Sequence, residues 1–454
     1  MNIIIAGGGR VGAMLARQLS AEGYNITLID KNQRTLEESV DAYDVMAVAG
    51  NCASMPILKE AGVQTADLLS AVTGEDEINL LCCTTAYAIN PKLHTIARIR
   101  NPEYTDQIHE MRNIFGLSMT VNPEKQTAVE IERLLKYPGF LRRDAFAKGR
   151  TEIVELRIDE NSKLAGVSLY SLNNIVKCKV LVCAVLRNGE AIAPKGNFTL
   201  LEGDRIFVTA PTESLTVLLK NLGIITRRAR NIILCGGGTV GFYLAKMLSK
   251  NGITVQLIEK DRARCKELAA QLPKINVLQG DGTDCNMLAA ENLANCDAIV
   301  TMTGSDEMNM IISLYAESRG VPQIITKLGR FEEYNQSLIS SLALGSVICP
   351  RDLCCNDIVR YVRAMENQSG AAVSVHAIAD GQIEAVEFLV DRTTENCGIP
   401  LKELKLRSDV LIAGIIHGSF ASVPNGDSRF HAGDTLIVVT SQRGSLKCLN
   451  DIFQ

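Results

Sequence analysis

Residues 3–12 read IIIAGGGRVG, and residues 232–241, which lie 229 positions later, read IILCGGGTVG. In each copy a short apolar run leads into Gly-x-Gly-x-x-Gly. In the first copy Val11, Leu15 and Leu19 then recur every fourth residue, which is typical of one face of a helix. Such a turn lets the backbone approach a pyrophosphate, and the helix start offers N–H groups to phosphate. The sequence predicts two dinucleotide-binding turns, the alternative being tight turns without a ligand.

The similarity between the two copies extends along the whole chain. Residues 72–77, VTGEDE, correspond to residues 302–307, MTGSDE, at an offset of 230. Further on, VLVCAVLRNG at 180–189 corresponds to VLIAGIIHGS at 410–419. The chain is therefore a duplication of one two-part unit, and each copy takes about half of the length.

The two parts of the unit have different periodicities. The first alternates short apolar runs with helix-length segments, which predicts a parallel, doubly wound sheet. The second begins with TEIVELRI at 151–158, whose period of two predicts a small antiparallel module. The expected fold class is α/β, with two Rossmann-type doubly wound parallel-sheet domains, each followed by a small α+β domain.

The expected domain boundaries follow from these changes of pattern. Helical segments near 127–135 and 356–365 join the two parts of each copy, with linkers near 137–150 and 366–373. The expected domains are a Rossmann-type domain at 1–125, a linker helix at 126–145, a C-terminal domain at 146–228, and the corresponding parts of copy two at 229–350, 351–370 and 371–454.

The composition excludes several classes of protein. The 454 residues are 46% apolar and 22% charged, as in ordinary globular chains. The net charge of −4 gives no electrostatic drive toward a polyphosphate backbone, so no nucleic acid is expected as the main partner. Neither an export signal nor an apolar run of ~20 residues is evident. We therefore expect a cytoplasmic protein whose 14 cysteines are reduced and mostly buried.

An acidic residue follows each glycine turn at the spacing of a ribose ligand. Asp30 and Glu259 each end the second strand, 18 residues after the last glycine. A carboxylate there can accept both ribose hydroxyls and repels a 2′-phosphate, which favours NAD(H), or ATP or ADP, over NADP(H). Lys31 and Lys260 follow directly and soften this repulsion. The alternative is a solvated acid at a strand end.

Later strands bring further candidates to the same edge of the sheet. Thr73-Gly74 and Thr303-Gly304 follow the fourth strand of each copy, at the carboxyl edge where open α/β sheets bind ligands. Arg98 and its counterpart Lys327 can neutralise phosphate there, or else are surface cations. The acidic residues at 75–77 and 305–307 are expected to cap the next helix.

Catalytic and metal-binding motifs are missing from the sequence. It contains no HExxH, CxxC, Walker-type GxxxxGK or Tyr-x-x-x-Lys pattern, and its cysteine pairs lack zinc-finger spacing. The histidines are not duplicated between the copies, since His417 corresponds to Arg187. We expect no catalytic residue and no metal site. An NAD-dependent oxidoreductase with an atypical substrate domain and a scaffold with empty lobes remain as alternatives.

The whole chain resembles the regulatory subunits of Trk-type potassium uptake systems, which are built from two RCK (KTN) units. The most specific features are IIIAGGGRVG with the Asp30 strand, GVQTADLLSAVTGEDEINLLCC at 62–83, HTIARIRNPEY at 94–104 and GDTLIVVTS at 433–441.

The resemblance implies a function, partners and a set of site residues. It implies a nucleotide-sensing protein at the cytoplasmic face of the membrane. Such a protein forms a homo-oligomeric ring beneath a potassium-translocating (TrkH/TrkG-type) membrane subunit. The implied NAD(H) site of copy one consists of Gly7, Gly8, Gly9, Arg10, Val11, Gly12, Asp30, Lys31, Asn51, Cys52, Thr73, Gly74 and Arg98.

In copy two the implied site consists of Gly236, Gly237, Gly238, Thr239, Val240, Gly241, Glu259, Asp281, Thr303, Gly304 and Lys327. Three departures distinguish it: Glu259 replaces Asp, Lys327 replaces Arg, and Gly329 stands where copy one has Arg100. These departures leave ADP, ATP or no ligand open for copy two.

Overall fold

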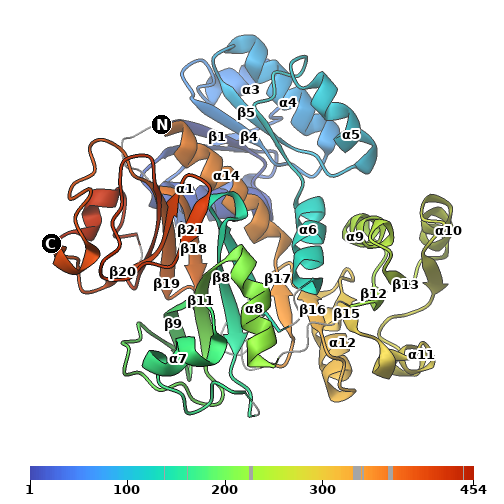
Figure 1. Ribbon diagram of the computed structural model, residues 1–454. Helices are drawn as coiled ribbons and strands as arrows, with labels where there is room; N and C mark the ends of the chain where they lie inside the picture. Colours follow the sequence, from blue (N-terminus) through green and yellow to red (C-terminus); the bar gives the residue numbers. More distant parts are fainter. Residues whose placement is uncertain are drawn as a thin grey trace. The chain divides into compact units, whose positions relative to one another are not determined.

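The computed structural model describes all residues except 137–138, 161, 224–228, 331–338, 340–341, 367–371 and 443. The chain divides into two compact units. Unit 1 comprises residues 1–128 and 349–366, and unit 2 comprises residues 129–348 and 367–454. Figure 1 labels their helices and strands. Among the described residues, no helix combines the length and apolar character needed to cross a bilayer.

Unit 1 is built on a six-stranded parallel sheet with the order β3-β2-β1-β4-β5-β6. Its strands are β1 (Asn2–Ala6), β2 (Asn25–Asp30), β3 (Met46–Ala49), β4 (Leu68–Ala71), β5 (His94–Arg98) and β6 (Met119–Val121). Its helices are α1 (Arg10–Ala21), α2 (Gln33–Ala42), α3 (Met55–Glu60), α4 (Asp76–Ile89), α5 (Pro102–Met111) and α14 (Pro350–Glu366). The strand order reverses between β1 and β4, which is where sheets of this topology bind ligands.

A helix from the second copy covers the first copy's sheet. In α14, Cys355, Ile358 and Val362 are fully buried in one cluster with residues of α1 and β1. Arg363 of α14 forms an ion pair with Glu22, the residue after α1. Figure 1 shows α14 beside α1 accordingly. The linker helix of copy two is therefore part of the fold of lobe one.

Unit 2 contains three sheets. The second Rossmann lobe repeats the first, with the order β14-β13-β12-β15-β16-β17. Its strands are β12 (Asn231–Cys235), β13 (Thr254–Glu259), β14 (Asn276–Gln279), β15 (Ala298–Thr301), β16 (Ile324–Lys327) and β17 (Ser346–Ile348). Its helices are α9 (Thr239–Lys250), α10 (Arg262–Gln271), α11 (Cys285–Ala290) and α12 (Asp306–Ser318).

The linker helix of copy one packs against this second lobe. That helix, α6 (Pro123–Leu135), begins in unit 1, and its later turns belong to unit 2. The side chain of Gln323 donates to the Leu134 carbonyl at 2.8 Å, and Asn251 donates to Glu132 at 2.7 Å. The two linker helices are thus exchanged between the copies.

The two C-terminal domains have matching antiparallel sheets, in the orders β10-β9-β11-β8-β7 and β18-β19-β22-β20-β21. The first contains β7 (Arg142–Phe146), β8 (Thr151–Arg157), β9 (Leu181–Arg187), β10 (Glu190–Ile192), β11 (Arg205–Pro211) and the helices α7 (Leu169–Val176) and α8 (Thr212–Leu222). The second contains β18 (Ala372–Ile378), β19 (Ile383–Leu389), β20 (Val410–His417), β21 (Phe420–Ser422) and β22 (Thr435–Thr440).

The predicted fold class is confirmed, since two parallel-sheet lobes are each followed by an antiparallel domain. The expected linker near 137–150 is wrong in part, because strand β7 lies within it and pairs with β8. Its residues Arg143 and Asp144 are charged yet buried, so their pattern did not indicate a strand. Of the second expected linker, 366–373, residues 367–371 lie outside the described part of the chain.

The two C-terminal sheets share one buried apolar cluster, which includes Phe146, Phe207, Ile378 and Ile437. At its edge, the guanidinium of Arg205 contacts both carboxylate oxygens of Asp380 at 3.0 Å and also pairs with Glu155. Burial raises the pKa of Glu155, and Arg205 opposes that rise. One cation therefore compensates two carboxylates that come from different domains.

Replacing Arg205 is expected to destabilise unit 2. Arg205→Met leaves Glu155, which is 4% exposed, without its cation and should cost about 3 kcal/mol. The matched control, Arg157→Met, removes an exposed ion pair of the neighbouring strand and should change stability by less than about 0.5 kcal/mol. Urea unfolding followed by circular dichroism measures both.

The pH dependence of this loss has a defined sign. Without Arg205 the pKa of Glu155 rises further, and a carboxyl whose folded-state pKa is raised destabilises the fold above that pKa. Protonation on acidification removes the penalty. The difference between Arg205→Met and the wild type should therefore be larger at pH 8 than at pH 5, and equal differences would contradict this role of Glu155.

Candidate nucleotide-binding sites

The first glycine turn connects β1 to α1 at the carboxyl edge of the sheet. Gly7 has φ +107° and donates to the Ile29 carbonyl at 2.8 Å. A Cβ on Gly7 would lie 3.0 Å from the backbone of Thr73, and a Cβ on Gly12 would lie 1.8 Å from the Gly7 carbonyl oxygen. The fold itself therefore requires glycine at positions 7 and 12.

Gly9, in contrast, has no such reason to be glycine. Its φ of −63° and ψ of −173° are open to any residue, and a Cβ there would meet no atom within 4 Å. It is the N-cap of α1, which has no side-chain cap and no acidic residue in its first turn. The space above an uncapped helix start fits a phosphate group, because the N–H groups and the helix dipole favour an anion.

The second copy repeats this geometry at Gly236, Gly238 and Gly241. Gly236 has φ +116°, and a Cβ on Gly241 would lie 2.3 Å from the Gly236 carbonyl oxygen. Gly238 is extended, caps α9 without a side-chain bond and also faces open space. Thr239 and Val240 begin α9 as Arg10 and Val11 begin α1.

Each strand-end carboxylate holds its glycine turn. Asp30 accepts hydrogen bonds from the Gly8 N–H at 2.6 Å and from the Asn32 N–H at 2.8 Å. Glu259 accepts from the Gly237 N–H at 2.7 Å and from the Asp261 N–H at 2.8 Å. A carboxylate has about four acceptor positions, so both retain acceptor capacity for ribose hydroxyls.

A buried asparagine that sequence analysis missed braces the loop after β4. The amide oxygen of Asn79 accepts from the Thr73 N–H at 2.8 Å and from its hydroxyl at 2.7 Å, and the amide group donates to the Arg98 carbonyl at 2.8 Å. Asn309 makes the same bonds to Thr303 and Lys327, at 2.8, 2.7 and 2.9 Å. The signal available in the sequence was an asparagine six residues after the threonine in both copies. Beside each threonine, Gly74 and Gly304 face open space.

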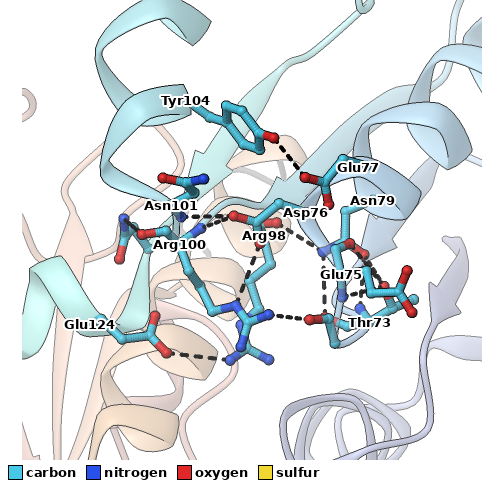
Figure 2. A network of polar contacts seen from close by, with 12 residues as sticks. Thr73, Glu75, Asp76, Glu77, Asn79, Arg98, Arg100, Asn101, Tyr104 and Glu124 are labelled. Carbon is cyan, nitrogen blue, oxygen red and sulfur yellow. Dashed lines mark hydrogen bonds and ion pairs between the residues drawn. The ribbon is translucent and has the colours of Figure 1, made fainter. Parts of the chain in front are cut away.

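The two strand-end cations differ between the copies. The guanidinium of Arg98 is 16% exposed and lies 3.5 Å from the carboxylate of Glu124, the second residue of α6 (Figure 2). Its Nε is buried without a hydrogen-bond partner among the described residues. Lys327 instead donates to the carbonyls of Met302 and Thr303, at 3.3 and 2.9 Å. Arg98 therefore has a donor left for a ligand.

Asp76 lies in the first turn of α4, as expected from the helix dipole, but its carboxylate does not cap that helix. Its carboxylate accepts from the N–H groups of Arg100 and Asn101 at 2.7 and 2.8 Å, and so joins the loops after β4 and β5 (Figure 2). The side chain of Arg100 in turn bonds to the Gly74 carbonyl. These partners lie 24 or more residues away, which local spacing cannot reveal.

Copy two keeps this connection with its cation shifted by one residue. Asp306 accepts from the N–H groups of Gly329 and Arg330 at 2.8 and 2.9 Å, and the Arg330 guanidinium lies 3.7 Å from it. The glycine at 329 therefore does not remove the arginine from this corner of the site.

The two copies are less similar in the loop that follows the third strand of each sheet, β3 in copy one and β14 in copy two. In copy one, Asn51 accepts from the Ala53 N–H, and Cys52 is buried next to Cys82. In copy two, Asp281 forms an exposed ion pair with Lys260 at 2.9 Å, and this hydrogen bond lowers the pKa of Asp281 to about 2. In copy one the corresponding positions are held by Lys31 and the neutral Asn51.

Arg264 is a further residue of the second site that the motifs did not indicate. It lies in α10 at the position of Thr35, and its Nε donates to the Gly237 carbonyl at 2.9 Å. The second glycine turn therefore has an adjacent guanidinium, where copy one has a threonine methyl group 2.9 Å from the Cβ position of Gly8.

The fold and the two glycine turns define a class: a tandem of Rossmann lobes, each followed by a small antiparallel domain. Family models agree. The TrkA-N domain matches residues 3–123 and 232–350, and the TrkA-C domain matches residues 153–223 and 385–448. The chain belongs to the TrkA family of Trk system potassium uptake proteins.

Curated relatives match the full length of the chain. A Trk system potassium uptake protein TrkA homolog from Archaeoglobus fulgidus is 34% identical and covers 96% of this chain and 97% of its own. The Trk system potassium uptake protein TrkA of Haemophilus influenzae is 30% identical and covers 100% and 99%. These relatives are named as potassium uptake proteins and not as enzymes, so the prediction of a non-enzymatic protein is confirmed and the oxidoreductase alternative is not supported.

Solved structures share the fold. The GsuK RCK domain has a TM-score of 0.60 at 16% identity and covers 96% of this chain and 92% of its own. The GsuK channel bound to NAD has a TM-score of 0.59 at 17% identity, covering 97% and 76%.

Substitutions in the first glycine turn should separate folding from binding. Gly12→Ala places a methyl group against the Gly7 carbonyl and should destabilise unit 1 by about 1–3 kcal/mol. Gly9→Ala should cost at most about 1 kcal/mol, the preference of an N-cap, yet weaken dinucleotide binding at least about tenfold. Thermal melts and titrations measure the two effects, and unchanged binding by Gly9→Ala would contradict a ligand at this turn.

Proposed function

We propose that this protein is a cytoplasmic nucleotide-sensing subunit of a Trk-type potassium uptake system. Nucleotide bound at its Rossmann lobes gates a membrane subunit that translocates potassium. The observation that carries the proposal is the open space at Gly9 and Gly238, next to uncapped helix starts and anchored carboxylates. The relatives that match this chain over nearly their full length are named potassium uptake proteins, which supports the physiological role.

We assign NAD(H) to copy one. Asp30 would accept the adenosine ribose hydroxyls, the turn from Gly7 to Gly12 would hold the pyrophosphate, and Thr73, Gly74 and Arg98 would contact the other half of the ligand. The unpaired Nε of Arg98 supports a contact with an anionic or carbonyl oxygen. A structural relative, the GsuK channel, is known with NAD bound, which supports this choice of ligand.

Copy two is better suited to ADP or ATP. Glu259 retains a ribose acceptor, and Arg264, at the position of Thr35, places a guanidinium beside the glycine turn. A guanidinium beside the turn can donate in a planar fork to terminal phosphate oxygens, which suits a nucleoside di- or triphosphate. GsuK has also been solved with ADP, with a TM-score of 0.50 and 14% identity over 80% of this chain and 69% of its own.

The polar network after β4 and β5 connects the proposed ligand site to the linker helix α6. A ligand at Thr73 and Gly74 would shift the loops that Asn79 and Asp76 tie to β5. Arg98, at the end of β5, contacts Glu124 in α6. Because α6 continues without a break from unit 1 into unit 2, a displacement at Glu124 would be passed along the helix. A differential affinity worth 1–3 kcal/mol is typical of such coupling.

Equivalent helices of the two lobes expose apolar side chains that suit a ring. Leu81 of α4 is 54% exposed, and its counterpart Ile311 of α12 is 52% exposed, flanked by Met308 and Leu314. A group of exposed apolar side chains, such as Met308, Ile311 and Leu314 on α12, is typical of an interaction surface. We propose that these faces join copies of the chain into a ring on the cytoplasmic side of a TrkH/TrkG-type subunit.

Calorimetric titration of the full chain with NADH, NAD, ATP and ADP tests the proposal. Asp30→Ala should abolish binding of NAD(H), and Glu259→Ala should abolish binding of ADP or ATP. Asp30→Asn keeps an acceptor for the Gly8 N–H and distinguishes loss of charge from loss of the loop. The matched control, Asp41→Ala, removes an exposed acid of α2 and should bind like the wild type. The account fails if the wild type binds none of the four ligands, or if both site variants bind unchanged.

A further inference from the structure

A buried carboxylate with two imidazoles lies in the second C-terminal domain. Asp434, in the turn before β22, is 6% exposed. Its carboxylate accepts a hydrogen bond from the backbone N–H of His431 at 2.6 Å. The Nδ1 of His417, at the end of β20, lies 2.8 Å from its other oxygen, and the Nδ1 of His431 lies 3.9 Å from the first. One ligand atom from each of the three residues lies within 4.8 Å of the other two.

The first copy shows what this position requires. There Asp204 is 1% exposed and accepts the Leu201 N–H at 2.8 Å, as Asp434 accepts the His431 N–H. Arg187, at the position of His417, donates twice to Asp204 at 2.7 Å. A permanent cation thus compensates the buried carboxylate and ties the strand end to the turn.

Copy two has histidines at the two corresponding positions: His417 in place of Arg187, and His431 in place of Leu201. No lysine or arginine pairs with Asp434 in the part of the chain that the structure describes. Histidine, unlike arginine, is not permanently charged at neutral pH. A buried carboxylate is costly without compensating charge, and a divalent cation held by His417, His431 and Asp434 would supply what the guanidinium of Arg187 supplies in copy one.

We propose that His417, His431 and Asp434 bind a divalent transition-metal ion of the Zn²⁺ class. Two imidazole nitrogens and one carboxylate oxygen are a donor set for such an ion, whereas Ca²⁺ and Mg²⁺ prefer oxygen ligands. The imidazoles are 45% and 62% exposed, so an ion can enter from solvent, and water fills the remaining coordination positions. The ion would replace the Arg187–Asp204 pair as the tie between the end of β20 and the turn before β22.

The chain supplies a matched variant for the test. His417→Arg together with His431→Leu converts the cluster to the arrangement of copy one, which is compatible with the fold. Wild type and double variant, both purified without a histidine tag and stripped with EDTA, are titrated with ZnCl₂, and with CoCl₂ while visible absorption is recorded. Cys285→Ser in both backgrounds removes an exposed thiol as a competing ligand, and Cys397, whose thiol lies near Asp434, is kept. His94→Ala serves as a control for loss of an exposed imidazole.

The wild type should bind one more equivalent of metal than the double variant, and Zn²⁺ should raise its melting temperature reversibly with EDTA. The double variant should melt at a temperature that Zn²⁺ does not change, and His94→Ala should behave like the wild type. Equal stoichiometry in wild type and double variant, or a melting temperature of the wild type that does not respond to Zn²⁺, would overturn the proposal. Failure of the metal-binding proposal would not contradict the proposed nucleotide sites, which involve other residues.

Discussion

The hydrogen bond between a strand-end carboxylate and a glycine-turn amide organises each half of the molecule. It measures 2.6 Å from Gly8 to Asp30 and 2.7 Å from Gly237 to Glu259. The same carboxylates bind the amide two residues after themselves, so each one joins the first and second strands to the start of the first helix. A ligand that engages the carboxylate and the turn together would find both already in place, which lowers the cost of ordering them on binding.

The duplication lets one half serve as the reference for the other. Where the copies agree, as in the asparagine that braces Thr73 and Thr303, the shared arrangement belongs to the fold. Where they differ, as at Arg264 and at His417, the second copy has gained a charge or a ligand atom that the fold does not need. The linker helices are exchanged, so each Rossmann lobe is completed by a helix of the other copy.

Local patterns were sufficient for the strands of the two parallel sheets and for the helix starts that follow the glycine turns, since periodicity and glycine spacing act over a few residues. Contacts between distant segments were not accessible in this way. Asp76 bonds to a loop 24 residues later, and α14 packs on a lobe more than 300 residues earlier. The sequence pattern did not indicate strand β7 because its charged residues are paired: Arg143 pairs with Glu152 of β8, and Asp144 pairs with Arg142 of the same strand. Charge alone therefore misled the prediction.

Potassium uptake by proteoliposomes tests the central claim most directly. The full chain is reconstituted with the Trk-type membrane subunit of the same organism, and uptake is followed as NADH, NAD, ATP or ADP is added. The account predicts that at least one nucleotide changes the rate, that Asp30→Ala removes the response to NAD(H), and that Asp41→Ala keeps it. An uptake rate that is independent of all four nucleotides, measured with protein that binds them, would contradict the claim that binding at the Rossmann lobes gates transport.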